Sequence, residues 1–345
     1  MKEGTDRAIL PLISASGTSR GAEAVSDTLA TPPVLILSRR EFIGTTAAAV
    51  VSAAEPDGPS KIIDTHVHFY DPSRPQGVPW PPKDDKLLYR TVLPAEFRRI
   101  AEPLGVTGAI EVEASPWLED NQWVLDLAEK NPIIVGTVGD LQPGTSDFRK
   151  HLDRFRKNRR FRGIRCGNLW GRALEAEMKD PHFISDLKFM ADAGLEMDTA
   201  NPSPALIADV LRLSSRIPSL RIVIDHLPID LPPEPQIRRK YETDLQELGK
   251  RPQVYVKVSN VPRVVKGRVP EDIDYYRPAL DRLWEIFGPD RLIYGSNWPV
   301  SGHVAPYPVA LRIVRKYFAT KGKAASEKYF WRNATIAYGL SPGAA

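Results

Sequence analysis

The feature that most constrains this chain is a regular alternation of short apolar segments with longer amphipathic ones, which begins near residue 61 and runs to the C-terminus. Each apolar segment has the length of a buried strand, and each amphipathic one has the length of a helix. The predicted strands cover residues 62–68, 107–113, 133–138, 161–166, 194–199, 221–226, 254–259 and 292–297. The predicted helices cover residues 94–103, 117–130, 148–157, 181–193, 204–216, 241–249 and 276–287, with closing helices at 308–320 and 326–338. About eight strand–helix units favour a parallel sheet that closes into a (β/α)8 TIM barrel, an α/β fold.

One such barrel accounts for residues 58–345 as a single domain, because (β/α)8 barrels typically run to about 250 residues. An apolar fraction of 42% with 26% charged residues is ordinary for a globular enzyme with a sizeable core. A formal net charge of +4 is small for 345 residues and gives no reason to expect a nucleic-acid partner. The composition is therefore that of a globular protein rather than a disordered one.

Residues 1–57 differ from the rest, being small and polar without sustained periodicity. The pair Arg39 and Arg40 precedes a short apolar run over 44–54, and this arrangement resembles a twin-arginine export signal. We expect a largely disordered, signal-like extension without a stable membrane anchor, since a bilayer span needs about 20 apolar residues. The lone Cys166 excludes intramolecular disulfides and suits export in the folded state, to the periplasm or beyond. The alternative is a disordered basic tail on a cytoplasmic protein.

Polar residues stand at the ends of the predicted strands. In a barrel these carboxyl ends meet around one pocket, where such enzymes keep their active sites. The residues at these ends are His66, His68, Glu113, Asp140, Arg165, Asp198, Asp225, His226, Lys257, Ser259 and Asn297. So many polar ends on one rim predict a catalytic pocket.

Three histidines form the centre of the predicted pocket. His66 and His68 are two apart in a strand, so both imidazoles face the same side, and His226 follows the sixth strand. Such a set can bind one divalent metal ion, most readily zinc, or can polarise a substrate carbonyl without a metal. Asp225 should point away from the pocket by strand alternation, unless the strand has already ended, and should then have a structural role.

Four segments carry a resemblance to a known family. They are Ile-Ile-Asp-Thr-His-Val-His at 62–68, Ile-Asp-His-Leu-Pro at 224–228, Val-Tyr-Val-Lys-Val-Ser at 254–259 and Arg-Leu-Ile-Tyr-Gly-Ser-Asn-Trp-Pro-Val at 291–300. Together they resemble the amidohydrolase-related family, and most of all its branch of sugar lactonases and 2-pyrone-4,6-dicarboxylate lactonases. The resemblance implies a (β/α)8 barrel that hydrolyses a lactone or a similar small cyclic ester.

The chain departs from this pattern at Asn297, where the family has an aspartate that activates water. An amide does not accept a proton at neutral pH and is a poor metal ligand, but it can orient a water molecule. Glu113 is the first candidate for the missing base, and His68 or His226 is the second. The third alternative is a non-catalytic protein that binds a related ligand.

Four further residues are predicted to contact substrate. Arg165 can grip a carboxylate with a two-pronged pair, and Lys257 stands at the next-to-last strand end. Trp80 lies on the loop after the first strand and can wall a pocket for a ring. Trp298 follows Asn297, where it would contact substrate or hold the last loop against the barrel.

These observations predict a lactone hydrolase in which water attacks a carbonyl polarised by the rim histidines, with or without a divalent ion. A metal-dependent decarboxylase is the alternative from another reaction class, because relatives of this fold bind zinc through the same positions. Nothing in the sequence predicts the oligomeric state.

Overall fold

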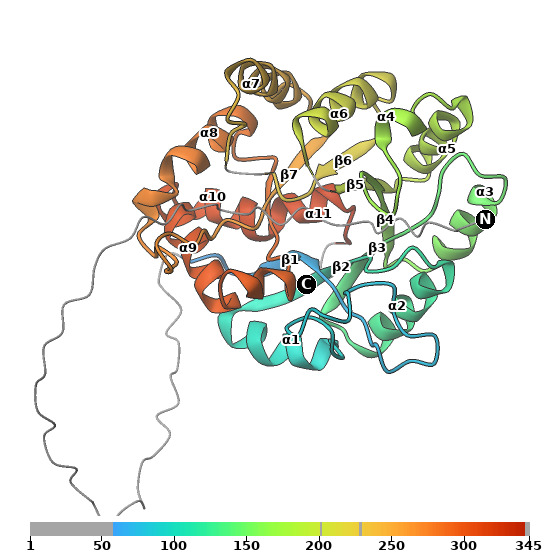
Figure 1. Cartoon of the computed structure of the whole chain (residues 1–345), viewed down its shortest axis with the longest axis horizontal. Coiled ribbons are helices and arrows are strands. Elements are labelled where there is room, and N and C mark those ends of the chain that lie inside the picture. Colours follow the sequence, from blue (N-terminus) through green and yellow to red (C-terminus); the bar gives the residue numbers. More distant parts are fainter. Residues whose placement is uncertain (1–57, 201, 228–229, 342–345) are drawn as a thin grey trace, which may run out of the picture. The chain divides into compact units, whose positions relative to one another are not determined.

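The computed structural model describes residues 58–200, 202–227 and 230–341, so the predicted export signal lies outside the described residues. Within them, eight parallel strands pair in sequence order from β1 to β8. The strands are β1 (Ile62–Val67), β2 (Val106–Val112), β3 (Ile134–Gly139), β4 (Phe161–Gly167), β5 (Glu196–Ala200), β6 (Arg221–Ile224), β7 (Val254–Val258) and β8 (Leu292–Tyr294). The helices surround them, as in the predicted TIM barrel (Figure 1).

The helices that follow the strands agree with the predicted alternation. They are α1 (Pro94–Ala101), α2 (Leu118–Lys130), α3 (Phe148–Phe155), α4 (Leu174–Glu177), α5 (Pro181–Asp192), α6 (Pro204–Arg216), α7 (Pro235–Gly249), α8 (Arg277–Phe287), α9 (Tyr307–Thr320), α10 (Lys323–Glu327) and α11 (Asn333–Ala337). The 3-10 turns η1 (Glu102–Leu104), η2 (Ile273–Tyr275) and η3 (Val300–His303) and the π-helical turn η4 (Lys328–Arg332) complete them.

Three helices differ from the prediction. The closing helix expected over 326–338 is divided into the end of α10, the π-helical turn η4 and α11. The helix expected from residue 241 begins at Pro235, because proline suits the first turn, where its missing N–H would have no partner. The short α4 was not predicted, since four residues are too few to show a helical period.

Backbone hydrogen bonds join the first and last strand ends and so bring two predicted site segments together. The Asn297 N–H donates to the His66 carbonyl, and the His68 N–H donates to the Trp298 carbonyl, both at 2.9 Å. The Thr65 hydroxyl donates to the Tyr294 carbonyl at 2.6 Å. The contacts that close the barrel thus place Asn297 beside the two histidines of β1.

An apolar cluster lines part of the barrel interior. Its side chains come from successive strands and pack against the C-terminal segment: Ile63, Ile110, Val112, Val135, Val138, Val223, Tyr255, Ile293, Ala334, Ala337, Tyr338 and Leu340. The segment around α11 crosses the ring of strands in Figure 1. The segment around α11 therefore fills one end of the barrel, and the predicted site residues lie at the other end.

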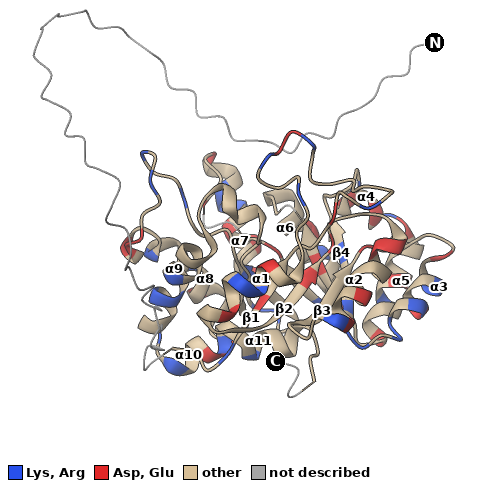
Figure 2. Cartoon of the chain, turned by 90° about the horizontal axis from the view of Figure 1, so that it is seen from below, with Lys and Arg blue, Asp and Glu red and all other residues tan. Residues whose placement is uncertain are grey.

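Acidic and basic residues are intermingled along the helices in Figure 2, in keeping with the small net charge. None of the described helices combines the length and the apolar character needed to cross a membrane.

Candidate active site

The structure brings the three predicted histidines together at the carboxyl end of the barrel. The Nε2 atoms of His66 and His68 are 3.2 Å apart. The ring centroids of His66 and His226 are 4.2 Å apart. One residue of β1, the first residue after it and one residue after β6 therefore form one cluster of imidazoles.

Burial keeps these imidazoles neutral. It lowers the pKa of His68 to about 4 and that of His226 to about 3, and it holds the pKa of His66 well below its usual value. The Nδ1 of His68 lies 2.8 Å from the Val112 carbonyl, which only accepts, so this nitrogen carries the proton. The Nε2 of neutral His68 is consequently unprotonated, and its lone pair is directed at His66.

A buried chain of charges lies beside His66. The Lys257 ammonium pairs with Asp198 and lies 2.8 Å from an Asp225 oxygen and 3.2 Å from His66 Nδ1. The Arg165 Nε lies 3.0 Å from the other Asp225 oxygen. Although burial raises the pKa of Asp225, Lys257, His66 and Arg165 together hold it well below its ordinary value. Asp225 is thus an anion that orients the cluster.

Asp225 meets the exception to its expected outward direction. The sixth strand ends at Ile224, so alternation no longer governs the next residue, and Asp225 turns into the barrel. The substrate contact predicted for Lys257 does not agree with its placement. Its side chain is completely buried, and its charge is neutralised by Asp198 and Asp225.

Two proton arrangements satisfy His66. If the Nδ1 of His66 accepts from Lys257, its Nε2–H donates to the lone pair of His68. If Nδ1–H instead faces the Asp225 oxygen at 3.5 Å, Nε2 presents a second lone pair beside that of His68. The first arrangement is complete without a metal, and the second prepares two nitrogen ligands.

Asn297 and its neighbours lie just past the ends of β6, β7 and β8 in left-handed backbone conformations. The φ angles are 48° at His226, 52° at Asn260 and 61° at Asn297. Asparagine and histidine tolerate this region better than most residues that bear a side chain. Such strain gathers at functional sites, and here it points polar side chains where alternation would not.

The Asn297 side chain contacts the histidine cluster directly. Its Oδ1 lies 3.2 Å from His68 Nε2, and its Nδ2 donates to the Asn260 Oδ1 at 3.1 Å. The His226 Nδ1 lies 2.6 Å from the Ser259 hydroxyl. Ser259 had no predicted role and Asn260 was not among the predicted site residues, although both follow an apolar strand as the other site residues do.

Glu113 lies at the edge of the cluster through Arg165. One oxygen accepts from the Ser115 N–H and the Trp170 indole N–H, both at 3.1 Å, and the other faces the Arg165 guanidinium at 3.6 Å. Burial raises the pKa of Glu113 to about 8, against the opposing effect of Arg165. The carboxyl group is therefore poised to exchange a proton near neutral pH. The Arg165 side chain is occupied by Glu113 and Asp225, so the predicted grip on a substrate carboxylate would require these pairs to loosen.

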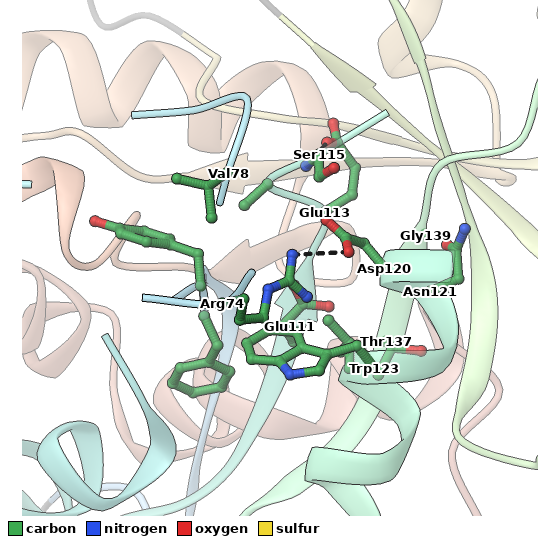
Figure 3. A pocket seen from close by; sticks show the side chains of 14 residues that line it. Arg74, Val78, Glu111, Glu113, Ser115, Asp120, Asn121, Trp123, Thr137 and Gly139 are labelled. Atoms are coloured by element: carbon green, nitrogen blue, oxygen red, sulfur yellow. Dashed lines mark hydrogen bonds and ion pairs between the residues drawn. The ribbon is translucent and has the colours of Figure 1, made fainter. Parts of the chain in front are cut away.

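A small pocket lies on the far side of Glu113, between the loop after β1 and the start of α2 (Figure 3). Its free volume of about 20 Å³ holds roughly one water molecule. Arg74 pairs there with Asp120 at 2.8 Å and stacks over the Trp123 ring, as Figure 3 shows. Glu111 is completely buried beside it, and burial raises its pKa well above the usual value. This pocket anchors the loop to α2 and is too small for a substrate.

The two predicted tryptophans have different environments. The Trp80 ring lies 5.6 Å from His68 and 5.3 Å from Tyr70, on the loop of residues 68–93, so it walls the histidine cluster. Trp298 packs between Phe69 and Phe97 and is 5% exposed. Its predicted substrate contact does not agree with this packing, whereas the alternative role of holding the last loop does.

The residues present fit a divalent metal ion. Two nitrogens bound to one tetrahedral zinc ion at about 2.0–2.1 Å stand roughly 3.3 Å apart, which is close to the 3.2 Å between the Nε2 atoms of His66 and His68. His66, Asp225 and His226 form another group whose ligand atoms lie within 4.8 Å of one another. We favour the Nε2 side of His66, because Lys257 and Arg165 already neutralise Asp225.

Comparison with known proteins agrees with this geometry. The model of the amidohydrolase family matches residues 63–340. The chain belongs to this family. An L-fucono-1,5-lactonase from Burkholderia ambifaria is 30% identical over 254 residues, which cover 71% of this chain and 83% of that protein.

Solved structures share the fold of this amidohydrolase. An amidohydrolase from Burkholderia multivorans with bound zinc has a TM-score of 0.71 at 22% identity, covering 81% of this chain and 99% of its own. A probable 2-pyrone-4,6-dicarboxylic acid hydrolase from Acinetobacter baumannii, with citric acid bound, has a TM-score of 0.64 at 20% identity over the same shares. The protein is a hydrolase of the lactonase-like branch that its strand-end motifs resemble.

Proposed function

We propose that this hydrolase opens the lactone ring of a small sugar acid. The observation that carries the proposal is the cluster of neutral His66, His68 and His226 with Asn297, linked through Asp225 and Arg165 to Glu113, whose pKa burial raises to about 8. Neutral imidazoles and an amide bind a polar carbonyl and a water molecule, and a carboxyl group of this pKa exchanges the proton. The L-fucono-1,5-lactonase similarity supports a sugar lactone as the substrate class.

Glu113 would move the proton in both halves of the reaction. As a carboxylate it takes a proton from the water that attacks the lactone carbonyl. As the resulting acid it returns the proton to the ring oxygen when the carbon–oxygen bond of the ring breaks. The products are one hydroxy acid and the unchanged enzyme, so water and lactone balance.

The other residues would bind and orient. Asn297 holds the attacking water between its amide and the histidines, and Trp80 lies against the substrate ring. Asp225, held by Lys257 and Arg165, fixes the proton arrangement of His66. His66, His68 and His226 are the residues proposed to hold a divalent ion, zinc first, which when bound would polarise the lactone carbonyl.

Lactone hydrolysis is tested with the purified full chain on a panel of aldonolactones, led by L-fucono-1,5-lactone, in a pH-indicator assay before and after chelation. His66→Ala should abolish turnover, because it removes the central imidazole. His182→Ala, an exposed histidine on α5, is the matched control and should keep full activity. Full activity of His66→Ala would refute the mechanism.

Two other functions are separated by the same samples. A decarboxylase would release carbon dioxide from an aromatic or enolic acid and lose this activity on chelation. A non-catalytic ligand-binding protein would show no turnover until Asn297→Asp restores the carboxylate of the family. Equal hydrolysis by wild type and Asn297→Asp would exclude that reading.

Export is a separate proposal, based on Arg39 and Arg40 ahead of the apolar run at 44–54. In a bacterial host, the full chain should reach the periplasm in a shortened form, and replacement of both arginines by lysine should retain it in the cytoplasm. Uncleaved wild-type protein found wholly in the cytoplasm would contradict the proposal.

A further inference from the structure

The orientation of one amide decides what the histidine cluster can bind. Asn297 has an acceptor, Oδ1, 3.2 Å from His68 Nε2, and a donor, Nδ2, whose hydrogen bond goes to Asn260 Oδ1 at 3.1 Å. Because the two ends of an amide have nearly the same shape, space alone does not choose between them. An acceptor that faces Nδ2 selects the orientation, and in this structure the Oδ1 of Asn260 is that acceptor.

The Asn260 side chain is directed at Asn297 by its backbone. It lies two residues past the end of β7 with φ at 52°, where strand alternation has ended. The Arg263 guanidinium donates to the backbone carbonyl of Asn260 and to those of the next two residues, which fastens this turn. The asparagine side chain is therefore presented to the site from a fixed turn.

With the amide held this way, three acceptor atoms can meet. They are the Nε2 atoms of His66 and His68 and the Oδ1 of Asn297. The two Nε2 atoms are 3.2 Å apart, and the Asn297 Oδ1 lies 3.2 Å from the Nε2 of His68. Facing lone pairs repel unless a cation or a donor lies between them. With the amide reversed, Nδ2 would donate to His68 and occupy the lone pair that a metal needs.

We propose that Asn260 is a positioning residue that keeps the Asn297 oxygen directed at His68 Nε2, so that the pair of asparagines supplies an uncharged acceptor where the family has a carboxylate. The acceptor set then suits a divalent cation. This inference deepens the proposed function by assigning the metal site its orienting residue, but it concerns cation binding and needs no particular substrate.

The test is zinc binding by the metal-stripped full chain, measured by titration calorimetry without substrate. Asn260→Ala removes the acceptor for Nδ2 and should weaken zinc binding about 10- to 100-fold, as loss of an orienting partner does at metal sites. Asn260→Asp keeps an acceptor that only accepts, so it should bind zinc at least as tightly as wild type. Asn131→Ala, at the C-terminal end of α2, is the matched control and should leave the zinc affinity unchanged.

Unchanged zinc affinity in Asn260→Ala, with a melting temperature like that of wild type, would overturn the inference, as would a wild-type protein that binds no zinc. Weaker binding in both Asn260→Ala and Asn260→Asp would also overturn it, because the acceptor would then not be what matters. If the lactone panel shows no turnover but the zinc results hold, the inference stands and the proposed function fails. If turnover is found and the zinc results fail, the reverse holds.

Discussion

Replacing Lys257 with methionine should destabilise the barrel strongly, because it leaves the buried Asp198 without its cation and Asp225 with Arg165 alone. The Lys257 side chain is completely buried between Asp198 and Asp225. Removing one partner of a buried ion pair costs about 3–5 kcal/mol of unfolding free energy. For a barrel of roughly 280 residues with about 2.1 cal/mol/K of unfolding entropy per residue, this corresponds to a fall in melting temperature of about 5–8 °C.

The loss should also depend on pH. Burial already raises the pKa of Asp198 to about 6, and the pKa should rise further once Lys257 is gone. A carboxyl group whose folded pKa lies above its unfolded value gives stability below the unfolded pKa and loses it as pH rises through the folded pKa. The deficit of Lys257→Met should therefore be small near about pH 5 and largest above about pH 7.

The assay is thermal unfolding followed by circular dichroism at several pH values. Lys240→Met is the matched control, because Lys240 makes a single pair with Asp244 and its side chain is 68% exposed. That change should alter the unfolding free energy by less than about 1 kcal/mol. A Lys257→Met protein that melts with wild type, or whose deficit is the same at every pH, would refute this account of the buried charges.

Three further predictions follow from single contacts. For Glu113, kcat/KM should rise with pH through a midpoint of about 8, because only the carboxylate takes the proton from water. Glu113→Gln should lower kcat by about 10²- to 10⁴-fold. A flat pH–rate profile would exclude Glu113 as the base. Trp80→Ala should raise KM roughly tenfold, and Trp80→Phe should keep most of the affinity, because an aromatic ring lines the pocket there. An unchanged KM in the alanine variant would show that Trp80 does not contact the substrate. Gly163→Ala should lower the melting temperature, because the added Cβ would lie 2.1 Å from the Glu196 carbonyl oxygen. Gly302→Ala is the control and should not lower it, since its added Cβ would lie 3.5 Å from the nearest atom, in the Leu87 side chain. Equal melting temperatures of the two variants would contradict this packing.

The architecture could be predicted because it depends on local periods. Apolar runs such as 62–68 and 254–259 have strand length, and the helical segments between them bury one face, so the order of elements follows from the chain alone. Boundaries were harder to predict. The strands at 221–226 and 292–297 end two to three residues earlier than their apolar pattern suggests, because the backbone turns left-handed at His226 and Asn297.

The candidate site could be predicted as a set of residues but not as a set of contacts. His66, His68, His226, Glu113 and Asn297 all lie where strand ends were expected. The roles of other residues depended on the partners they meet. Lys257 was assigned to substrate and is instead buried with two carboxylates, whereas Trp298 takes the second of its two predicted roles and packs under the last loop.

The sequence by itself determined that this protein is an eight-stranded barrel with histidines on its rim, since both follow from the spacing of residues that are near one another in the chain. The tertiary structure alone decided that Asp225 turns inward, that Asn260 orients Asn297, and that Lys257 neutralises rather than binds. The physical reason is that these contacts join strand ends far apart in sequence, which meet only when backbone hydrogen bonds close β8 onto β1. A local pattern records which side chains are available, whereas the closed barrel fixes which charges and lone pairs face one another.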